Sequence, residues 1–144
     1  MGFHINLEKA SFLTFAGAVF TALVGQWDGA IITLLLFMAA DWLSGLVVAG
    51  VFHKSPKSKN GALESRVGLK GLCRKGAMLL IVLVAYRLDL IAGLHGVLRT
   101  ATIVALACNE ALSILENVGL MGVKYPAIID KVIRQLLGEK ENKN

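Results

Sequence analysis

The sequence is poor in cysteine, which crosslinks small secreted domains, and it lacks the residue patterns of catalytic sites. Its 144 residues include two cysteines, two prolines and 7% aromatic residues. Cys73 and Cys108 lie in or beside apolar segments, and their positions indicate neither a disulfide framework nor a metal site. The sequence also lacks the spacing of a His, Ser or Cys triad and any zinc motif. We therefore predict no catalytic residue, no metal site, no cofactor and no enzymatic activity.

Apolar residues are abundant instead. They make up 56% of the chain, whereas soluble domains contain roughly 45–50%. A chain of this length forms one domain, which is too small to enclose so much apolar surface in a dry core. Because the apolar residues are concentrated in long runs, lipid is the expected solvent. We predict an all-α integral membrane protein in which residues 1–144 form a single membrane domain.

The long apolar runs predict the membrane-spanning helices. A helix needs about 20 mostly apolar residues to cross the hydrocarbon core. The predicted spans cover approximately residues 10–26, 30–52, 71–88 and 100–118. The first is shorter than the others and richer in Ala, Gly and Thr. The alternative to four spans is therefore three spans preceded by an N-terminal helix that lies in the membrane interface.

Two further features complete the predicted topology. The third span is expected to end near Leu88, with Gly93, His95 and Gly96 in the turn that follows. Residues 126–138 place isoleucine, valine and leucine at helical spacing and polar residues on the opposite side. This pattern predicts a C-terminal amphipathic helix, which could lie on the membrane, pack on the bundle or contact another subunit.

The net charge of +5 could suggest a nucleic-acid partner, but the distribution of the charge does not. Seven of the fifteen Lys and Arg residues lie between Lys54 and Lys75, between two apolar stretches. No motif that reads RNA or DNA accompanies them. Because basic residues are enriched in cytoplasmic loops, this loop and the C-terminus are expected in the cytoplasm. We predict a multi-pass protein of the bacterial cytoplasmic membrane without a nucleic-acid partner.

The basic loop, predicted at residues 53–70, leads into further basic residues at the start of the third span. Arg66, Lys70 and Arg74 share a face if this segment is helical, and Lys75 follows them. Each basic residue near anionic lipid contributes about 1 kcal/mol to the free energy of binding to the membrane surface. These four residues are therefore candidates for a surface that binds anionic lipids. The alternative is an ordinary solvated loop.

Polar residues interrupt the second and fourth spans at similar depth. Asp41 lies near the middle of its span and shares a face with Ser44 and Gly45. The polar residues of the fourth span are Asn109, Glu110, Ser113, Glu116 and Asn117. A carboxylate at the bilayer centre costs about 2.5–3.5 kcal/mol, so these side chains should face protein or water. They either hold a helical bundle together, or line water or mediate contacts between subunits of a homo-oligomer.

Three stretches carry distinctive motifs: Asp41-Trp42-Leu43-Ser44-Gly45, the segment from Leu63 to Lys75 with its Ser65, Gly68, Gly71 and terminal basic pair, and Asn109-Glu110-Ala111-Leu112-Ser113-Ile114-Leu115-Glu116-Asn117 followed by Pro126. They resemble motifs of the holin family that includes the clostridial toxin-release holins. The third is the most particular of the three. Their order and spacing extend the resemblance from residue 41 to about residue 137.

The resemblance implies a function that periodicity does not show. Such holins accumulate in the bacterial cytoplasmic membrane, associate with one another and permeabilise the membrane at a set time. A cell-wall hydrolase or a toxin, the functional partner, then leaves the cell without needing direct contact with the holin. Intramembrane carboxylates would equally suit a small ion channel or a proton-coupled transporter. An antiholin-type regulator of lysis is a further alternative.

Overall fold

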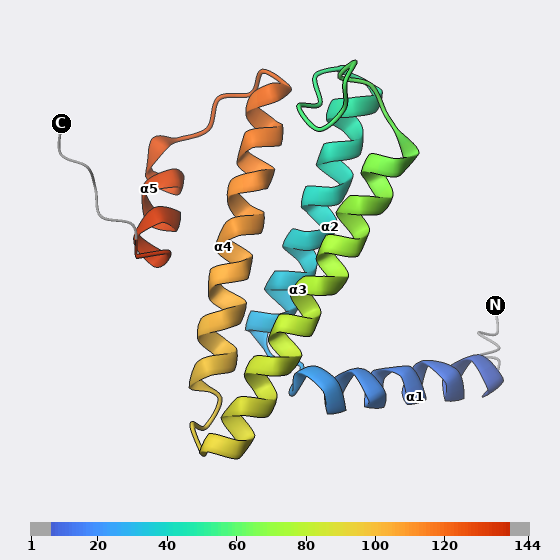
Figure 1. Cartoon of the computed structure of the whole chain (residues 1–144), viewed down its shortest axis with the longest axis vertical. Helices are drawn as coiled ribbons and strands as arrows, with labels where there is room; N and C mark the ends of the chain where they lie inside the picture. The colour runs from blue at the N-terminus through green and yellow to red at the C-terminus, as the bar shows by residue number, and fades with distance from the viewer. Residues whose placement is uncertain (1–6, 139–144) are drawn as a thin grey trace, which may run out of the picture.

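The computed structural model describes residues 7–138, in which every regular element is a helix (Figure 1). In chain order the helices are α1 Leu7–Val24, α2 Gly29–Gly50, α3 Ser65–Ala92, α4 Val97–Leu120 and α5 Ala127–Leu136. The predicted all-α class is confirmed for this part of the chain.

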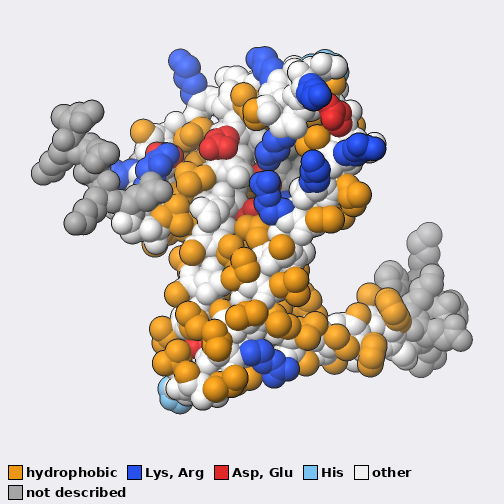
Figure 2. Space-filling model, viewed as in Figure 1, with side chains coloured by type: hydrophobic (Ala, Val, Ile, Leu, Met, Phe, Trp, Pro, Cys, Tyr) orange, Lys and Arg blue, Asp and Glu red, His pale blue; other side chains and the backbone are white. Residues whose placement is uncertain are grey.

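Helices α2, α3 and α4 run up, down and up to form a bundle (Figure 1). The most deeply buried side chains between them are Ile31, Leu34, Val48, Val82 and Ile103, each less than 2% exposed. The outer surfaces of the same helices carry many exposed leucine, isoleucine and valine side chains (Figure 2). A bundle that is apolar outside as well as inside is typical of helices that face lipid.

The two ends of the bundle are built differently. One end holds the turn between α1 and α2 and the turn between α3 and α4; we call it the Asp28 end. Asp28 caps α2 there, because its Oδ1 accepts a hydrogen bond from the Ile31 N–H at 3.0 Å. Gly93 ends α3 in the left-handed conformation, with φ of 64°. The opposite end holds the long loop between α2 and α3, and we call it the loop end.

Helices α1 and α5 lie outside the bundle. α1 leaves the Asp28 end at a steep angle to the bundle axis (Figure 1), and its Phe12, Leu13 and Phe15 are exposed. α5 runs beside α4 and buries Ile133. It falls within the segment 126–138 where an amphipathic helix is expected.

Helix α3 is longer than the sequence analysis predicts. It begins at Ser65, inside the segment 53–70 expected to be a loop, and it continues past Leu88 to Ala92. Hydropathy detects only the apolar middle of a helix, whereas helical hydrogen bonding continues through charged residues that reach solvent. Arg66 and Lys70 on the added N-terminal turns are indeed exposed.

Two of the described helices, α2 and α4, have the length and apolar composition to cross a membrane. The apolar part of α1, Ala10–Val24, is shorter. α3 is long enough, but it carries charged residues near both ends. The predicted count of four spans is therefore not confirmed.

Candidate functional site

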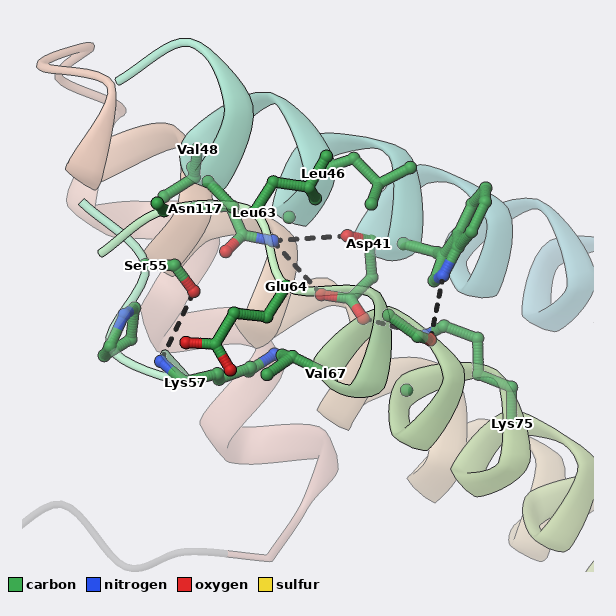
Figure 3. A pocket seen from close by; sticks show the side chains of 17 residues that line it. Asp41, Leu46, Val48, Ser55, Lys57, Leu63, Glu64, Val67, Lys75 and Asn117 are labelled. Atoms are coloured by element: carbon green, nitrogen blue, oxygen red, sulfur yellow. Dashed lines mark hydrogen bonds and ion pairs between the residues drawn. The ribbon is translucent and has the colours of Figure 1, made fainter. Parts of the chain in front are cut away.

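A cluster of charged and amide side chains joins α2, α3 and α4 near the middle of the bundle. Lys75 of α3 places its Nζ 2.8 Å from Oδ2 of Asp41 on α2, and it also donates to Oε2 of Glu110 on α4. Asn117, two turns further along α4, donates from Nδ2 to Oδ1 of Asp41 at 3.2 Å (Figure 3). We call these four residues the inner cluster.

The inner cluster is shielded from solvent. Its four members are only 6–8% exposed. In their ionised forms, two carboxylates and one ammonium leave one net negative charge. An unpaired charge in a low-dielectric interior costs several kcal/mol, whereas a paired and hydrogen-bonded charge is tolerated. Removing Lys75 would therefore leave the carboxylates of Asp41 and Glu110 without their cation and weaken the contacts among all three helices.

The residues around Asp41 form further contacts between helices. Nδ2 of Asn117 lies 2.8 Å from Oγ of Ser44 and 3.3 Å from the backbone carbonyl oxygen of Asp41. Gly45 faces the same amide. Trp42 points elsewhere, and its Nε1 donates to the carbonyl oxygen of Gly68 on α3 at 3.4 Å. The segment 41–45 of α2 thus contacts α4 on one side and α3 on the other.

A hollow of about 70 Å³ adjoins the inner cluster. Asp41, Lys75 and Asn117 contribute to one side of it, and Lys57 and Glu64 from the loop between α2 and α3 contribute to the other (Figure 3). The rest of the lining is largely apolar and includes Leu46, Val48 and Val67. The inner cluster therefore borders a small hollow that lies between it and the loop end.

Most of the polar residues predicted in the second and fourth spans meet in the structure. Those that do are Asp41, Ser44, Gly45, Glu110 and Asn117. Asn109 and Glu116 are instead exposed on the outside of α4, and Ser113 is half-buried. Neighbouring residues on a helix point about 100° apart. Only the packing shows which member of the Asn109–Glu110 pair faces inward.

Lys75 requires a correction to the predicted lipid-binding group. The sequence predicts Lys75 on the membrane surface with Arg66, Lys70 and Arg74, but the side chain is 8% exposed and paired with two carboxylates. Lys75 and Arg74 are neighbours on α3 and point about 100° apart, so Lys75 turns into the bundle while Arg74 stays exposed. The other three basic residues are exposed.

A second buried cluster, which the sequence pattern does not predict, closes the Asp28 end. Arg99 of α4 is 5% exposed and donates three hydrogen bonds across the turn between α1 and α2. Its Nε donates to the carbonyl oxygen of Val24 at 2.6 Å, its Nη2 to that of Gln26 at 2.7 Å, and its Nη1 to Oδ2 of Asp28 at 2.6 Å. These charge-assisted bonds fix the end of α1 to the bundle.

Asp89 of α3 completes this group, which we call the Arg99 cluster. The Asp89 carboxylate accepts hydrogen bonds from the backbone N–H groups of Leu98 and Arg99, at 3.0 and 2.6 Å, and so caps the start of α4. Burial raises the pKa of Asp28, but hydrogen bonds from the Ile31 N–H and the Arg99 guanidinium outweigh it and hold that pKa below 3.8. One sequence feature could have predicted the Arg99 cluster. Asp28 and Arg99 carry opposite charges, and each lies beside a turn that is expected on the same side of the membrane.

Replacing Gly25 with alanine is expected to disturb the Arg99 cluster. Gly25 has φ of +88°, and an added Cβ would lie 2.9 Å from Nε of Arg99 and 3.0 Å from Cε2 of Tyr86. The left-handed backbone alone should cost about 1–2 kcal/mol. Thermal unfolding in detergent checks this, with Gly29→Ala as the control, because nothing lies within 4 Å of a Cβ there. Equal melting temperatures for the two variants would contradict the geometry.

Comparison with known proteins finds relatives over most of the chain. The model of the bacteriophage holin family matches residues 18–138. An uncharacterized protein of Listeria innocua is 39% identical over 117 residues, which are 81% of this chain and 78% of that protein. An uncharacterized 14.9 kDa protein of Clostridium perfringens is 38% identical over 126 residues, or 86% and 89% of the two chains. A protein of Bacillus phage phi105 named a probable holin is 34% identical over 110 residues, 76% of each chain. No solved structure matches.

Proposed function

Because this chain belongs to the bacteriophage holin family, we propose that it oligomerises in the bacterial cytoplasmic membrane and permeabilises it, so that a cell-wall hydrolase or a toxin leaves the cell. The relative named a probable holin supports this function. The proposal requires no catalytic group, only helices that can exchange their contacts.

The inner cluster is the observation that carries the proposal beyond family membership. Asp41, Lys75 and Glu110 come from three different helices, and the Lys75 ammonium pairs with both carboxylates inside a bundle with an apolar exterior (Figure 2). A subunit of this kind can reside in lipid while its charges are paired. If the helices separate, the same charges become available to water or to other subunits. Charges that are hidden in one state and exposed in another suit a protein that accumulates before it permeabilises the membrane.

In the proposed topology α2, α3 and α4 cross the membrane and α1 lies in the outer interface. The steep angle of α1 to the bundle and the exposure of Phe12 and Phe15 support an interfacial helix over a fourth span (Figure 1). The loop end carries most of the basic residues and would face the cytoplasm together with the C-terminus.

The exposed basic residues of α3 are proposed to bind anionic lipids of the cytoplasmic leaflet. Arg66, Lys70 and Arg74 lie on the first turns of α3, and Leu69 and Leu72 beside them are also exposed. Cationic groups next to apolar side chains match a boundary at which anionic headgroups cover hydrocarbon. The same residues would hold the loop end at the membrane surface.

Controlled expression in bacteria tests the proposed function. Cells express the chain with and without a cytoplasmic cell-wall hydrolase while membrane potential and lysis time are recorded. We expect the potential to collapse abruptly, and the cells that contain the hydrolase to lyse soon afterwards. A change in potential with the hydrolase retained would indicate a selective channel or transporter. An unchanged potential in cells that express the chain alone would indicate a regulator such as an antiholin.

A further inference from the structure

Helix α4 has one long face that the rest of the described chain leaves largely uncovered. α3 and α5 flank α4 on opposite sides in Figure 1, and α2 packs along it and shares the inner cluster with it. The residues of the remaining face are Leu98, Thr102, Ala105, Asn109, Leu112, Glu116 and Gly119. None of them is buried: four are exposed, and Leu98, Thr102 and Leu112 are half-buried. We call this face the α4 seam.

The spacing along the α4 seam is that of two helices that wrap around each other. Its positions alternate in steps of four and three, which average 3.5 residues per turn as in a heptad repeat. Thr102, Asn109 and Glu116 occupy one heptad position, and the other four residues occupy the second. Ala105 and Gly119 are small enough to allow two backbones to approach closely in lipid.

Asn109 is the member of the α4 seam that lipid cannot accommodate. It lies near the middle of α4, which has the length and composition of a membrane span. Its amide is exposed, and within residues 7–138 it has no hydrogen-bond partner. An amide in hydrocarbon is costly unless its donor and acceptor are both used. The seam therefore needs a partner that offers both a donor and an acceptor at this depth.

We propose that the α4 seam binds the α4 seam of a second copy of this chain, with the two helices parallel and the two Asn109 amides paired. This pairing depends on the proposed function in one respect: all copies must enter the membrane in the same orientation. Parallel copies related by a two-fold axis bring identical residues together. An amide both donates and accepts, so two Asn109 side chains satisfy each other, whereas lipid tails offer neither group.

Glu116 is compatible with this pairing. It lies one helical turn before the end of α4 at Leu120, at the loop end. Two Glu116 carboxylates that face each other there can remain hydrated, which two carboxylates at the depth of Asn109 could not. The structure thus divides the polar residues of α4 between two tasks: Glu110 and Asn117 hold the subunit together, and Asn109 pairs subunits.

Disulfide crosslinking in native membranes tests the pairing. In a chain with Cys73→Ser and Cys108→Ser, one cysteine is introduced by Ala105→Cys on the seam or by Val84→Cys on α3. Ala105 lies eight residues from the start of α4 and Val84 eight residues from the end of α3, so both lie at similar depth, and both are exposed. We expect rapid disulfide dimers from Ala105→Cys and only slow, collisional dimers from Val84→Cys. Equal rates at the two positions would overturn the proposal.

Self-association in detergent, measured by sedimentation equilibrium with the native cysteines retained, gives a second test. Asn109→Leu should weaken the dimer by about threefold or more, and Asn109→Gln, which keeps the amide, should weaken it less. An Asn109→Leu dimer as strong as the original would overturn the proposal.

Failure of the seam and failure of the proposed function can be told apart. If the seam fails these tests while cells still lyse with the hydrolase, only the seam is wrong. If the seam dimerises but the membrane stays intact, the proposed function is wrong instead.

Discussion

Replacing Lys75 with methionine is expected to lower the free energy of unfolding by about 3–5 kcal/mol. The reason is that Lys75 is the cation shared by Asp41 and Glu110 inside the bundle. Without it, two carboxylates remain close together in a low-dielectric interior, and Asn117 donates a hydrogen bond to Asp41 alone. The measurement is thermal unfolding in detergent, together with the yield of protein that inserts into membranes.

Arg74→Met is the matched control for Lys75→Met, since it removes the same charge from the neighbouring residue. Arg74 is exposed, so its loss should change stability by no more than about 0.5 kcal/mol. Adding Asp41→Asn and Glu110→Gln to Lys75→Met should restore much of the lost stability, because no unpaired charge would remain. If Lys75→Met and Arg74→Met unfold at the same temperature, the inner cluster does not stabilise the bundle.

The second large effect is expected at the other end of the molecule, from Arg99→Met. This change removes the bonds to the carbonyl oxygens of Val24 and Gln26 and to the carboxylate of Asp28. Charge-assisted hydrogen bonds contribute about 1.5–3 kcal/mol each, although not additively, so a loss of about 3 kcal/mol is expected. The loss should be local, because the inner cluster is untouched.

Hydrogen exchange measured by mass spectrometry locates that local loss. In Arg99→Met the amides at the end of α1 and in the α1–α2 turn, residues 22–28, should exchange faster, while those of α2 around Asp41 keep their protection. Arg87→Met is the control, since Arg87 lies near the same end but is exposed. Unchanged exchange in the turn would show that Arg99 does not hold α1 in place.

The two buried clusters differ in how far the sequence reveals them. Asp41 and Glu110 each interrupt an apolar run at similar depth, which predicts that both face protein or water. Lys75 could not be predicted in the same way, because it follows Arg74 in a series of basic residues that a cytoplasmic loop explains equally well. Its burial depends on where α3 begins and on how α3 is rotated about its axis, which tertiary packing decides.

The steep angle of α1 to the bundle could not be predicted from the sequence either. The composition of residues 10–26 fits a weak span as well as an interfacial helix. In the structure, Arg99 fixes the end of α1 largely through the backbone carbonyl oxygens of Val24 and Gln26. Every residue has a carbonyl oxygen, so such contacts leave no trace in residue type or spacing. The apolar helices, by contrast, follow directly from run length.

Release from lipid vesicles measures permeabilisation by this chain most directly. The purified protein is reconstituted at increasing density into vesicles that contain anionic lipid and enclose both a small dye and a protein of hydrolase size. A holin should release the two cargoes together once a threshold density is passed. Escape of the dye with full retention of the enclosed protein at every density would contradict the account, as would vesicles that never leak.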